Sequence, residues 1–387
     1  MHDHTNGRVA WAMRASFPII AAALAACSDD TPTQPKANLP ATGLTKPSAV
    51  IHIIPEGTTF PTKIAFATGN PAGKEAMVKL YDKDGNQITS FLAFGSYADF
   101  SAGVDAAVGD VNGDGWPDII AGEGATPPGT PSSKISIWDG KTGTWLQTIT
   151  PFAGTFTNGV RVAAGDLDGD GKEEILACTG PGGGGNHVLA LRLGSSTPVT
   201  GTEYFADINN FPRVGGCHVA AGDFSGDGIA DEVVVFDGAP RNSLMVKNVK
   251  TGFIASWLDP MGWEYKKDLD VALSDVNGDG HEDILLSYLR DSAVVRAFDG
   301  SQLKLYTPLT MLKEIKPMWD TYGGGIHIAT HDLNGDGKKD LLFKQNNPTL
   351  LSFWATSFVF AKYGPTFTTM PFWFEEPGHL KPSGPIG

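Results

Sequence analysis

The sequence predicts an all-β chain that folds as a β-propeller of about six four-stranded blades. Five acidic loops recur along the chain, short strand-like apolar segments flank each loop, and 48 of the 387 residues are glycine. The loops begin 56, 57, 52 and 57 residues apart, at Asp110, Asp166, Asp223, Asp275 and Asp332. A fixed period of this size indicates a repeat architecture with one supersecondary unit per repeat. Tight turns between many strands explain the glycine content.

Residues 103–150 show what one repeat contains. The segment "VDAAVGD" predicts a first strand, the acidic loop follows it, and "DIIAGEG" predicts a second strand. The alternating segment "KISIWDG" predicts a third strand, and "TWLQTIT" predicts a fourth after a short turn. Four strands joined in this way form a meander, and meanders repeated around an axis form a propeller.

Residues 48–93 predict one more blade, which lacks the acidic loop. Its segment "AVIHII" resembles "GGIHIAT" at 324–330, and "TKIAFATG", "AMVKLYD" and "NQITSFLAF" follow as second, third and fourth strands. We therefore expect blades to begin near residues 48, 100, 156, 213, 265 and 322. The segment "TTMPFWFEE" in the tail 364–387 predicts a closing strand, and a count of seven blades is the alternative.

The first 47 residues carry the pattern of an export signal and a tether. Arg8 and Arg14 precede an apolar run that is too short to be a permanent membrane-spanning helix. The run ends in Leu24-Ala25-Ala26-Cys27, which resembles a bacterial lipobox. We expect a signal peptide over 1–26, a lipid on Cys27, a flexible Pro/Thr-rich linker over 27–47, and the propeller over 48–387. The alternative is an ordinary signal peptide.

This pattern predicts an exported protein that its lipid anchors to the bacterial cell envelope. We expect the outer membrane or the cell surface rather than the inner membrane. The net charge of −14 argues against a nucleic-acid partner held by phosphate contacts.

Each acidic loop has the form Asp-x-Asn/Asp/Ser-x-Asp-Gly-x-x-Asp/Glu. Ca²⁺ takes six to eight oxygen ligands, and a glycine at the sixth position permits the sharp turn such a loop needs. An EF-hand would place its last carboxylate at position 12 between helices, whereas here it stands at position 9 between strands. The sequence predicts about five structural Ca²⁺ ions. The predicted ligands are Asp110, Asn112, Asp114, Asp118, Asp166, Asp168, Asp170, Glu174, Asp223, Ser225, Asp227, Asp231, Asp275, Asn277, Asp279, Asp283, Asp332, Asn334, Asp336 and Asp340.

These loops and their spacing resemble the FG-GAP/VCBS repeat family, which includes the integrin α-subunit propeller. The resemblance covers most of residues 48–345 and implies a calcium-binding propeller. Two loops depart from the family pattern. The loop from Asp166 ends in Glu174, whose longer side chain shifts the ligand position, and the loop from Asp223 has Ser225 at position 3. We expect the loop from Asp223 to be the weakest site.

Two further residue sets recur in register with the loops. Five residues before each leading aspartate stand Asp105, Arg161, His218, Asp270 and His327, and His52 takes this place in the first repeat. These side chains share a strand face and are expected to line one end of the central channel, either as a ligand or metal site or as ion pairs in water. Aromatic residues mark the rim away from the loops, where Trp263, Tyr265, Trp319 and Tyr322 are candidate ligand contacts. Packing between blades is the alternative for them.

The sequence therefore predicts a calcium-stabilised, membrane-anchored propeller, facing the surface or the periplasm, that binds a protein or a glycan. Catalytic motifs are absent from the sequence, and we do not expect an enzyme. The alternatives are a polysaccharide lyase or hydrolase, with Arg161 and Asp105 or His218 in the channel, and a structural component of an envelope complex. Cys178 and Cys217 are expected on the same side of adjacent blades, where they form a disulfide or remain two free thiols.

Overall fold

The computed structural model divides the chain into the units Met1–Ala49 and Val50–Gly387. It describes residues 59–70, 76–83, 86–94, 103–126, 133–152, 156–181, 185–206, 216–237, 243–258, 260–261, 269–303, 308–316, 324–331, 339–345, 360–363 and 369–374. The predicted signal peptide, Cys27 and the linker lie outside these residues. The fold is therefore that of the second unit.

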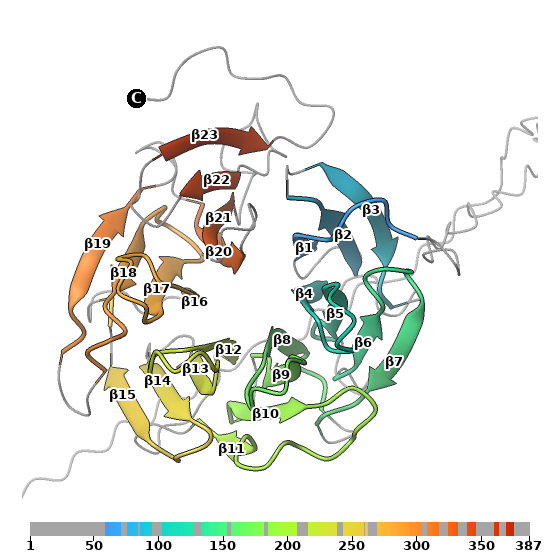
Figure 1. The fold of residues 1–387 in the computed structure, drawn as a ribbon, viewed down its shortest axis with the longest axis horizontal. Helices are drawn as coiled ribbons and strands as arrows, with labels where there is room; N and C mark the ends of the chain where they lie inside the picture. The colour runs from blue at the N-terminus through green and yellow to red at the C-terminus, as the bar shows by residue number, and fades with distance from the viewer. Residues whose placement is uncertain are drawn as a thin grey trace, which may run out of the picture. The chain divides into compact units, whose positions relative to one another are not determined.

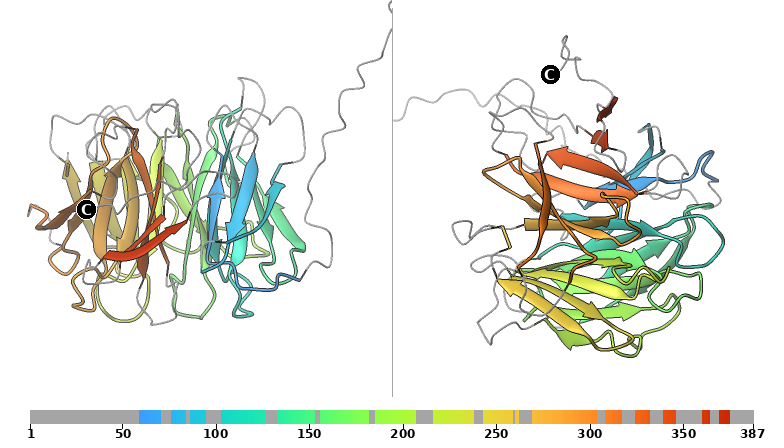
Figure 2. Two further views of the ribbon diagram at one scale, coloured as in Figure 1. Left: turned by 90° about the horizontal axis from the view of Figure 1, so that it is seen from above. Right: turned by 60° about the vertical axis from the view of Figure 1, so that its left-hand side comes forward.

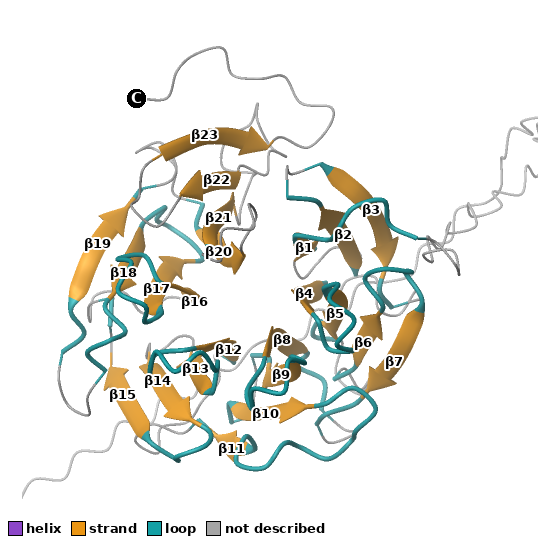
Figure 3. Cartoon of the chain, in the orientation of Figure 1, coloured by secondary structure: helices purple, strands orange, loops and turns teal. Residues whose placement is uncertain are grey.

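The described residues form six antiparallel sheets and no helix (Figure 3). The first sheet contains β1 (Phe66–Gly69), β2 (Met77–Tyr81) and β3 (Gln87–Leu92). The second contains β4 (Val104–Gly109), β5 (Asp118–Glu123), β6 (Ile135–Trp138) and β7 (Trp145–Ile149), and the third contains β8 (Val160–Gly165), β9 (Glu174–Thr179), β10 (His187–Leu191) and β11 (Tyr204–Phe205). The fourth contains β12 (Cys217–Gly222), β13 (Glu232–Asp237), β14 (Ser243–Asn248) and β15 (Ile254–Leu258). The fifth contains β16 (Leu269–Ser274), β17 (Asp283–Tyr288), β18 (Val295–Phe298) and β19 (Met311–Ile315), and the sixth contains β20 (Ile326–His331), β21 (Asp340–Gln345), β22 (Phe360–Tyr363) and β23 (Thr369–Phe374). In this part of the chain no helix is long and apolar enough to cross a membrane.

Within the second unit the six sheets follow one another in chain order around a common centre (Figure 1). The first strands β4, β8, β12, β16 and β20 are innermost, and each of the first four contacts the first strand of the next sheet. The outermost strands are β7, β11, β15, β19 and β23. The strands run between two rims, as the side views show (Figure 2). The predicted all-β propeller is confirmed.

Five of the six described sheets have four strands and the first has three. A Cβ added to Gly69 of β1 would collide with the carbonyl group of Val104, just as one added to Gly122 of β5 would meet that of Val160. Strand β1 therefore takes the place of a second strand, as "TKIAFATG" predicts. The predicted first strand of this blade, residues 49–54, lies outside the described residues. Strand β23 completes the sixth sheet, so "TTMPFWFEE" adds no seventh blade within the described part of the chain.

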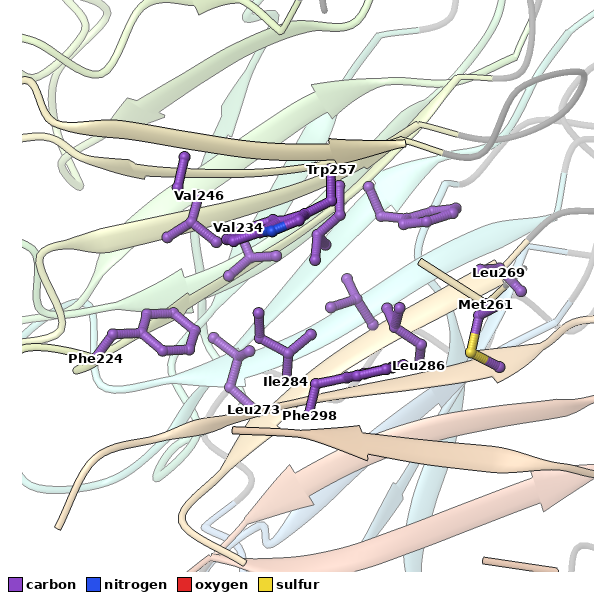
Figure 4. Close-up of a cluster of buried hydrophobic side chains, with 14 of the residues drawn as sticks. Phe224, Val234, Val246, Trp257, Met261, Leu269, Leu273, Ile284, Leu286 and Phe298 are labelled. Carbon is purple, nitrogen blue, oxygen red and sulfur yellow. The ribbon is translucent and has the colours of Figure 1, made fainter. Parts of the chain in front are cut away.

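The hydrophobic core lies between neighbouring sheets. Second strands such as β5 and β9 are buried along their whole length, because another sheet covers each face. Between the fourth and fifth sheets, Val234 and Trp257 pack with Leu273, Ile284 and Phe298 (Figure 4). Each such contact removes apolar surface from water, which is the main favourable term in folding.

Two further contacts hold particular sheets together. Ala65, Phe66 and Tyr81 of the first sheet or its edge cluster with Leu342 of the sixth, so the last sheet meets the first. Cys178 at the end of β9 forms a disulfide with Cys217 at the start of β12, and their Cα atoms are 5.9 Å apart. This covalent link joins the third sheet to the fourth.

Candidate metal loops and central channel

Each acidic loop that the structure describes connects the first strand of a sheet to its second strand, so these loops share one rim. The loops from Asp110, Asp166, Asp223 and Asp275 lie within the described residues. Residues 332–338 of the fifth loop, with Asp332, Asn334 and Asp336, lie outside them. Its last predicted ligand, Asp340, begins β21 and is buried.

The leading aspartate of each described loop folds the chain around its own carboxylate. Asp110 accepts hydrogen bonds from the backbone N–H groups of Gly113 (2.7 Å), Asp114 (3.1 Å) and Gly115 (2.7 Å). Asp166, Asp223 and Asp275 repeat the pattern. Gly115, at the sixth position, has a φ of 80°, which a side chain would strain. The oxygen-rich curl expected from the sequence is thus present.

The carboxylate at the start of the second strand is buried beneath each loop. Asp118 accepts hydrogen bonds from the N–H groups of Val111 (3.2 Å) and Gly140 (2.9 Å). Burial raises the pKa of Asp118 to about 7 and that of Asp283 to about 6, because desolvation disfavours the charged form. A divalent cation in the loop would supply the charge that favours ionisation. The donor set is made of oxygen atoms, which suits a hard cation such as Ca²⁺.

In the fourth sheet this buried position belongs to Glu232. Glu232 pairs with Gly222 in the sheet as Asp118 pairs with Gly109, and it accepts the N–H of Phe224 at 3.1 Å. The predicted ligand Asp231 lies one residue earlier, because this loop is one residue longer. Asp231 is also buried and accepts a hydrogen bond from Asn248 at 2.7 Å. The fixed spacing of the sequence pattern missed Glu232, although the adjacent acidic pair was a signal for it.

In the third sheet, Asp166, Asp168 and Glu174 offer one oxygen each within 4.8 Å of one another. Among the described residues, this is the one group of three or more His, Cys, Asp or Glu side chains whose ligand atoms lie close enough together to hold a metal ion. The guanidinium group of Arg192 contacts Asp168, and its Nε lies 3.1 Å from Glu174 Oε1. A permanent cation thus already lies against two of the three candidate ligands.

Neighbouring loops are joined to each other. The N–H of Glu173 donates to the carbonyl of Asp110 at 2.9 Å, and the N–H of Glu282 donates to the carbonyl of Asp223 at 2.9 Å. The ring of His281 lies 2.8 Å from the carbonyl of Phe224. Each of these loops therefore supports the loop of the preceding sheet.

The predicted channel residues that the structure describes contact one another between sheets, as one pair and one group of three. Asp105 lies 3.9 Å from Arg161 and accepts the N–H of Val162 at 2.8 Å. Asp270 lies 3.0 Å from His327 Nδ1 and 3.4 Å from His218 Nδ1. Burial alone would raise the pKa of Asp270, but hydrogen bonds from the two histidines hold it well below its usual range. This geometry favours ion pairs over an open ligand set, and His52 lies outside the described residues.

The predicted aromatic contacts Trp263, Tyr265, Trp319 and Tyr322 also lie outside the described residues. On the rim away from the loops the structure contains a row of rings, of which the sequence pattern had singled out Phe156 alone. The ring of Phe152 lies 5.7 Å from Phe156 and 5.2 Å from His187, which stacks on Phe205 at 4.5 Å. Phe205 is 62% exposed. This row shows that aromatic surface is available on the rim away from the loops.

Comparison with solved structures returns chains of low sequence identity, one of which is described as a β-propeller domain. A protein of unknown function from Bacteroides caccae is 10% identical with a TM-score of 0.47, covering 81% of this chain and 94% of that one. The Myceliophteria thermophila Cps50 (Swd1) β-propeller domain is 10% identical with a TM-score of 0.39, covering 79% and 95%. The V. cholerae biofilm matrix protein Bap1 is 16% identical with a TM-score of 0.32, covering 69% and 41%. No curated protein matches the sequence.

The sequence model of the FG-GAP-like repeat matches residues 110–177 and 275–343. Each region begins at the leading aspartate of an acidic loop and extends into the second strand of the following sheet, so it spans one sheet-to-sheet period. The first match covers the loops from Asp110 and Asp166, and the second covers those from Asp275 and Asp332. The chain therefore carries FG-GAP-like repeats within a β-propeller, as the acidic loops predicted.

Proposed function

We propose that this protein is a calcium-stabilised propeller, anchored to the bacterial envelope through a lipid on Cys27, that binds a protein or a glycan. The FG-GAP-like repeats and the propeller fold support a binding module. Calcium, the anchor and the ligand are the parts of the proposal that experiment has to test.

The observation that carries the calcium proposal is the repeated pairing of an oxygen-lined loop with a buried carboxylate. In the second sheet Asp110, Asn112, Asp114 and Asp118 would hold the ion, and in the fifth sheet Asp275, Asn277, Asp279 and Asp283 would do so. Bound Ca²⁺ would neutralise carboxylates that the fold has removed from water. Since the loop of the second sheet is hydrogen-bonded to that of the third, and the loop of the fourth sheet to that of the fifth, bound ions would also stabilise the contacts between these loops.

The opposite rim is the better candidate for ligand recognition. The connections there do not repeat the loop motif, and they include the aromatic row that ends at the exposed Phe205. Large aromatic side chains beside polar groups are typical of recognition sites. Trp263 and Trp319 belong to longer connections that the sequence places on the same rim.

Binding of the purified protein to a glycan array and to envelope proteins, with and without EDTA, tests this proposal. We expect Trp263→Ala or Trp319→Ala to weaken binding while calcium-dependent melting stays unchanged. Trp145→Ala is the matched control, because Trp145 is 57% exposed on the outer strand β7, away from that rim. Equal losses in all three variants would contradict the assignment of the face. Unsaturated sugar products would favour the lyase alternative.

The anchor has its own test. Cys27→Ser should release the protein from the membrane fraction of the producing cell, because no lipid can then be attached. If this variant still sediments with membranes and the native protein carries no lipid, the lipobox interpretation is wrong.

A further inference from the structure

The four described acidic loops differ in what faces their buried carboxylate. Asp118 and Asp283 accept hydrogen bonds from neutral backbone N–H groups, and Asp118 also accepts one from the Asn112 side-chain amide. Glu232 accepts them from a backbone N–H and the Asn248 amide. In the third sheet, Glu174 accepts the N–H of Leu167 with one oxygen, at 2.8 Å, and faces the guanidinium of Arg192 with the other, at 3.1 Å. Among these loops a positive charge directly contacts the strand-start carboxylate in the third sheet alone.

Arg192 stands at a position that the other sheets fill differently. It follows Leu191, the cross-strand partner of Ile175, so it lies across from Glu174. The equivalent residue is Asp139 in the second sheet and Asp299 in the fifth, which follow the paired Trp138 and Phe298. The sequence therefore places an arginine where two other sheets have an aspartate.

The residue at loop position 3 changes together with this one. In the second sheet the Asn112 amide donates to Asp139 across 3.5 Å. In the third sheet the direction of this hydrogen bond is reversed, because Arg192 donates to the loop residue Asp168. The same two positions thus form a pair with net charge −1 in the second sheet and a neutral pair in the third.

Lysines near the other loops do not take this role. Lys141 Nζ lies 3.9 Å from Asp114, and Lys250 Nζ lies 4.0 Å from Asp231, with lysine side chains that are 49% and 57% exposed. Each contacts one carboxylate at the limit of an ion pair. Arg192 contacts two candidate ligands of one site, and its planar group stays charged at all physiological pH values.

We infer that Arg192 is the built-in counter-charge of the third-sheet loop, which therefore does not bind calcium when the other loops do. A Ca²⁺ ion between Asp166, Asp168 and Glu174 would have to displace the guanidinium or lie beside it against repulsion. The close approach of Asp168 and Glu174 reflects the arginine that they share. The inference rests on the proposed function for the other loops, and it predicts one ion fewer than the number of acidic loops.

A reciprocal exchange tests this inference. The full protein is equilibrated with Ca²⁺, and the ions bound per chain are counted by equilibrium dialysis with metal analysis. Asp168→Asn with Arg192→Asp installs the second-sheet pair in the third sheet and should add about one bound ion. Asn112→Asp with Asp139→Arg installs the third-sheet pair in the second sheet and should remove about one.

A single change keeps the test decisive if an exchange variant does not fold. Asp170→Asn alone should leave the ion count of the native protein unchanged, because this loop holds no ion to lose. Asp114→Asn, at the same loop position in the second sheet, is the matched control and should lower the count. The inference is overturned if Asp170→Asn removes an ion as Asp114→Asn does, or if the folded third-sheet exchange variant gains none.

Failure of the proposed function would look different. If the native protein binds no calcium at all, the calcium proposal is wrong, and melting in EDTA then decides the role of Arg192. Arg192→Asn should lower the Tm in EDTA, because Asp168 and Glu174 lose their counter-charge, whereas Lys141→Asn should leave it nearly unchanged. Equal effects of the two changes would overturn the counter-charge role.

Discussion

Breaking the Cys178–Cys217 disulfide is expected to lower stability by about 4 kcal/mol. The two cysteines are 39 residues apart, and both are fully buried between the third and fourth sheets. In the chain-entropy model, closing a loop of roughly 40 residues removes about 13 cal/mol/K from the unfolded chain, which gives about 4 kcal/mol at 25 °C. The stabilisation acts mainly through the unfolded state, so the folded propeller should keep its structure.

This free energy converts into a shift in Tm. A unit of roughly 340 residues gains about 0.7 kcal/mol/K of entropy on unfolding, at about 2.1 cal/mol/K per residue. The Tm should therefore fall by roughly 6 °C if the unit melts as one cooperative transition. Scanning calorimetry of oxidised and reduced protein in a Cys27→Ser background measures the shift. Because both sulfur atoms are buried, the reduced sample should be prepared in denaturant and refolded.

The double variant Cys178→Ala/Cys217→Ala is the control, because its Tm should not respond to the reductant. Thiol titration of the unfolded, oxidised Cys27→Ser protein, with Cys178 and Cys217 intact, should detect no free thiol. An equal Tm for oxidised and reduced protein would contradict the role of the disulfide. Two free thiols in the oxidised sample would show that the bond is not formed.

Three further outcomes are expected. EDTA should lower the Tm of the native protein sharply, since a loop with a Kd near ~10⁻⁴ M in ~1 mM Ca²⁺ contributes about 1.4 kcal/mol; an unchanged melting curve would contradict the structural role of calcium. Asp270→Asn should lower the Tm at neutral pH, and this difference in Tm from the native protein should shrink below about pH 4. The reason is that a carboxyl whose folded pKa is depressed stabilises the fold above its unfolded pKa and loses that contribution as the pH falls. A deficit that is the same at pH 3 and pH 7 would show that packing, rather than charge, is lost. Glu232→Gln should remove calcium binding from the fourth-sheet loop, whereas Asp231→Asn should weaken it less, and isothermal titration can measure both. A larger loss in Asp231→Asn would show that the residue at loop position 9, as the sequence predicts, is the ligand.

The repeat pattern predicted the fold because each acidic loop fixes the ends of two strands. Once Asp110 and Asp166 are aligned, the strands before and after them follow, and the sheets appear in the predicted order. The buried strand-start carboxylate was predictable where the loop has its usual length, as at Asp118. It was missed at Glu232, because one inserted residue shifts the strand and the sequence alone does not show where the strand begins.

Contacts that cross between repeats were harder to predict. Arg192 lies outside the loop motif and reaches Glu174 only because the third strand pairs with the second. The stacking of His187 on Phe205 depends on the pairing of β10 with β11, for which the sequence offers no periodic signal. The disulfide could be predicted as one of two outcomes, because the strand register places both cysteines on the same side of adjacent sheets.

The distribution of charge within the second unit indicates which surfaces remain for recognition. Asp105 and Asp270 each accept a backbone N–H from the next sheet, at Val162 and Ile328, so these channel carboxylates hold adjacent sheets together. On the loop rim, hydrogen bonds between neighbouring loops engage the backbone in a similar way. Within the described residues both sets of hydrogen bonds join one sheet to the next, so they serve the fold. Under the proposed function, by contrast, we expect a ligand to contact residues that differ from one sheet to another, and the connections of the opposite rim carry such residues. A search for the ligand should therefore begin with variants of those connections, since changes in the channel would alter stability together with binding.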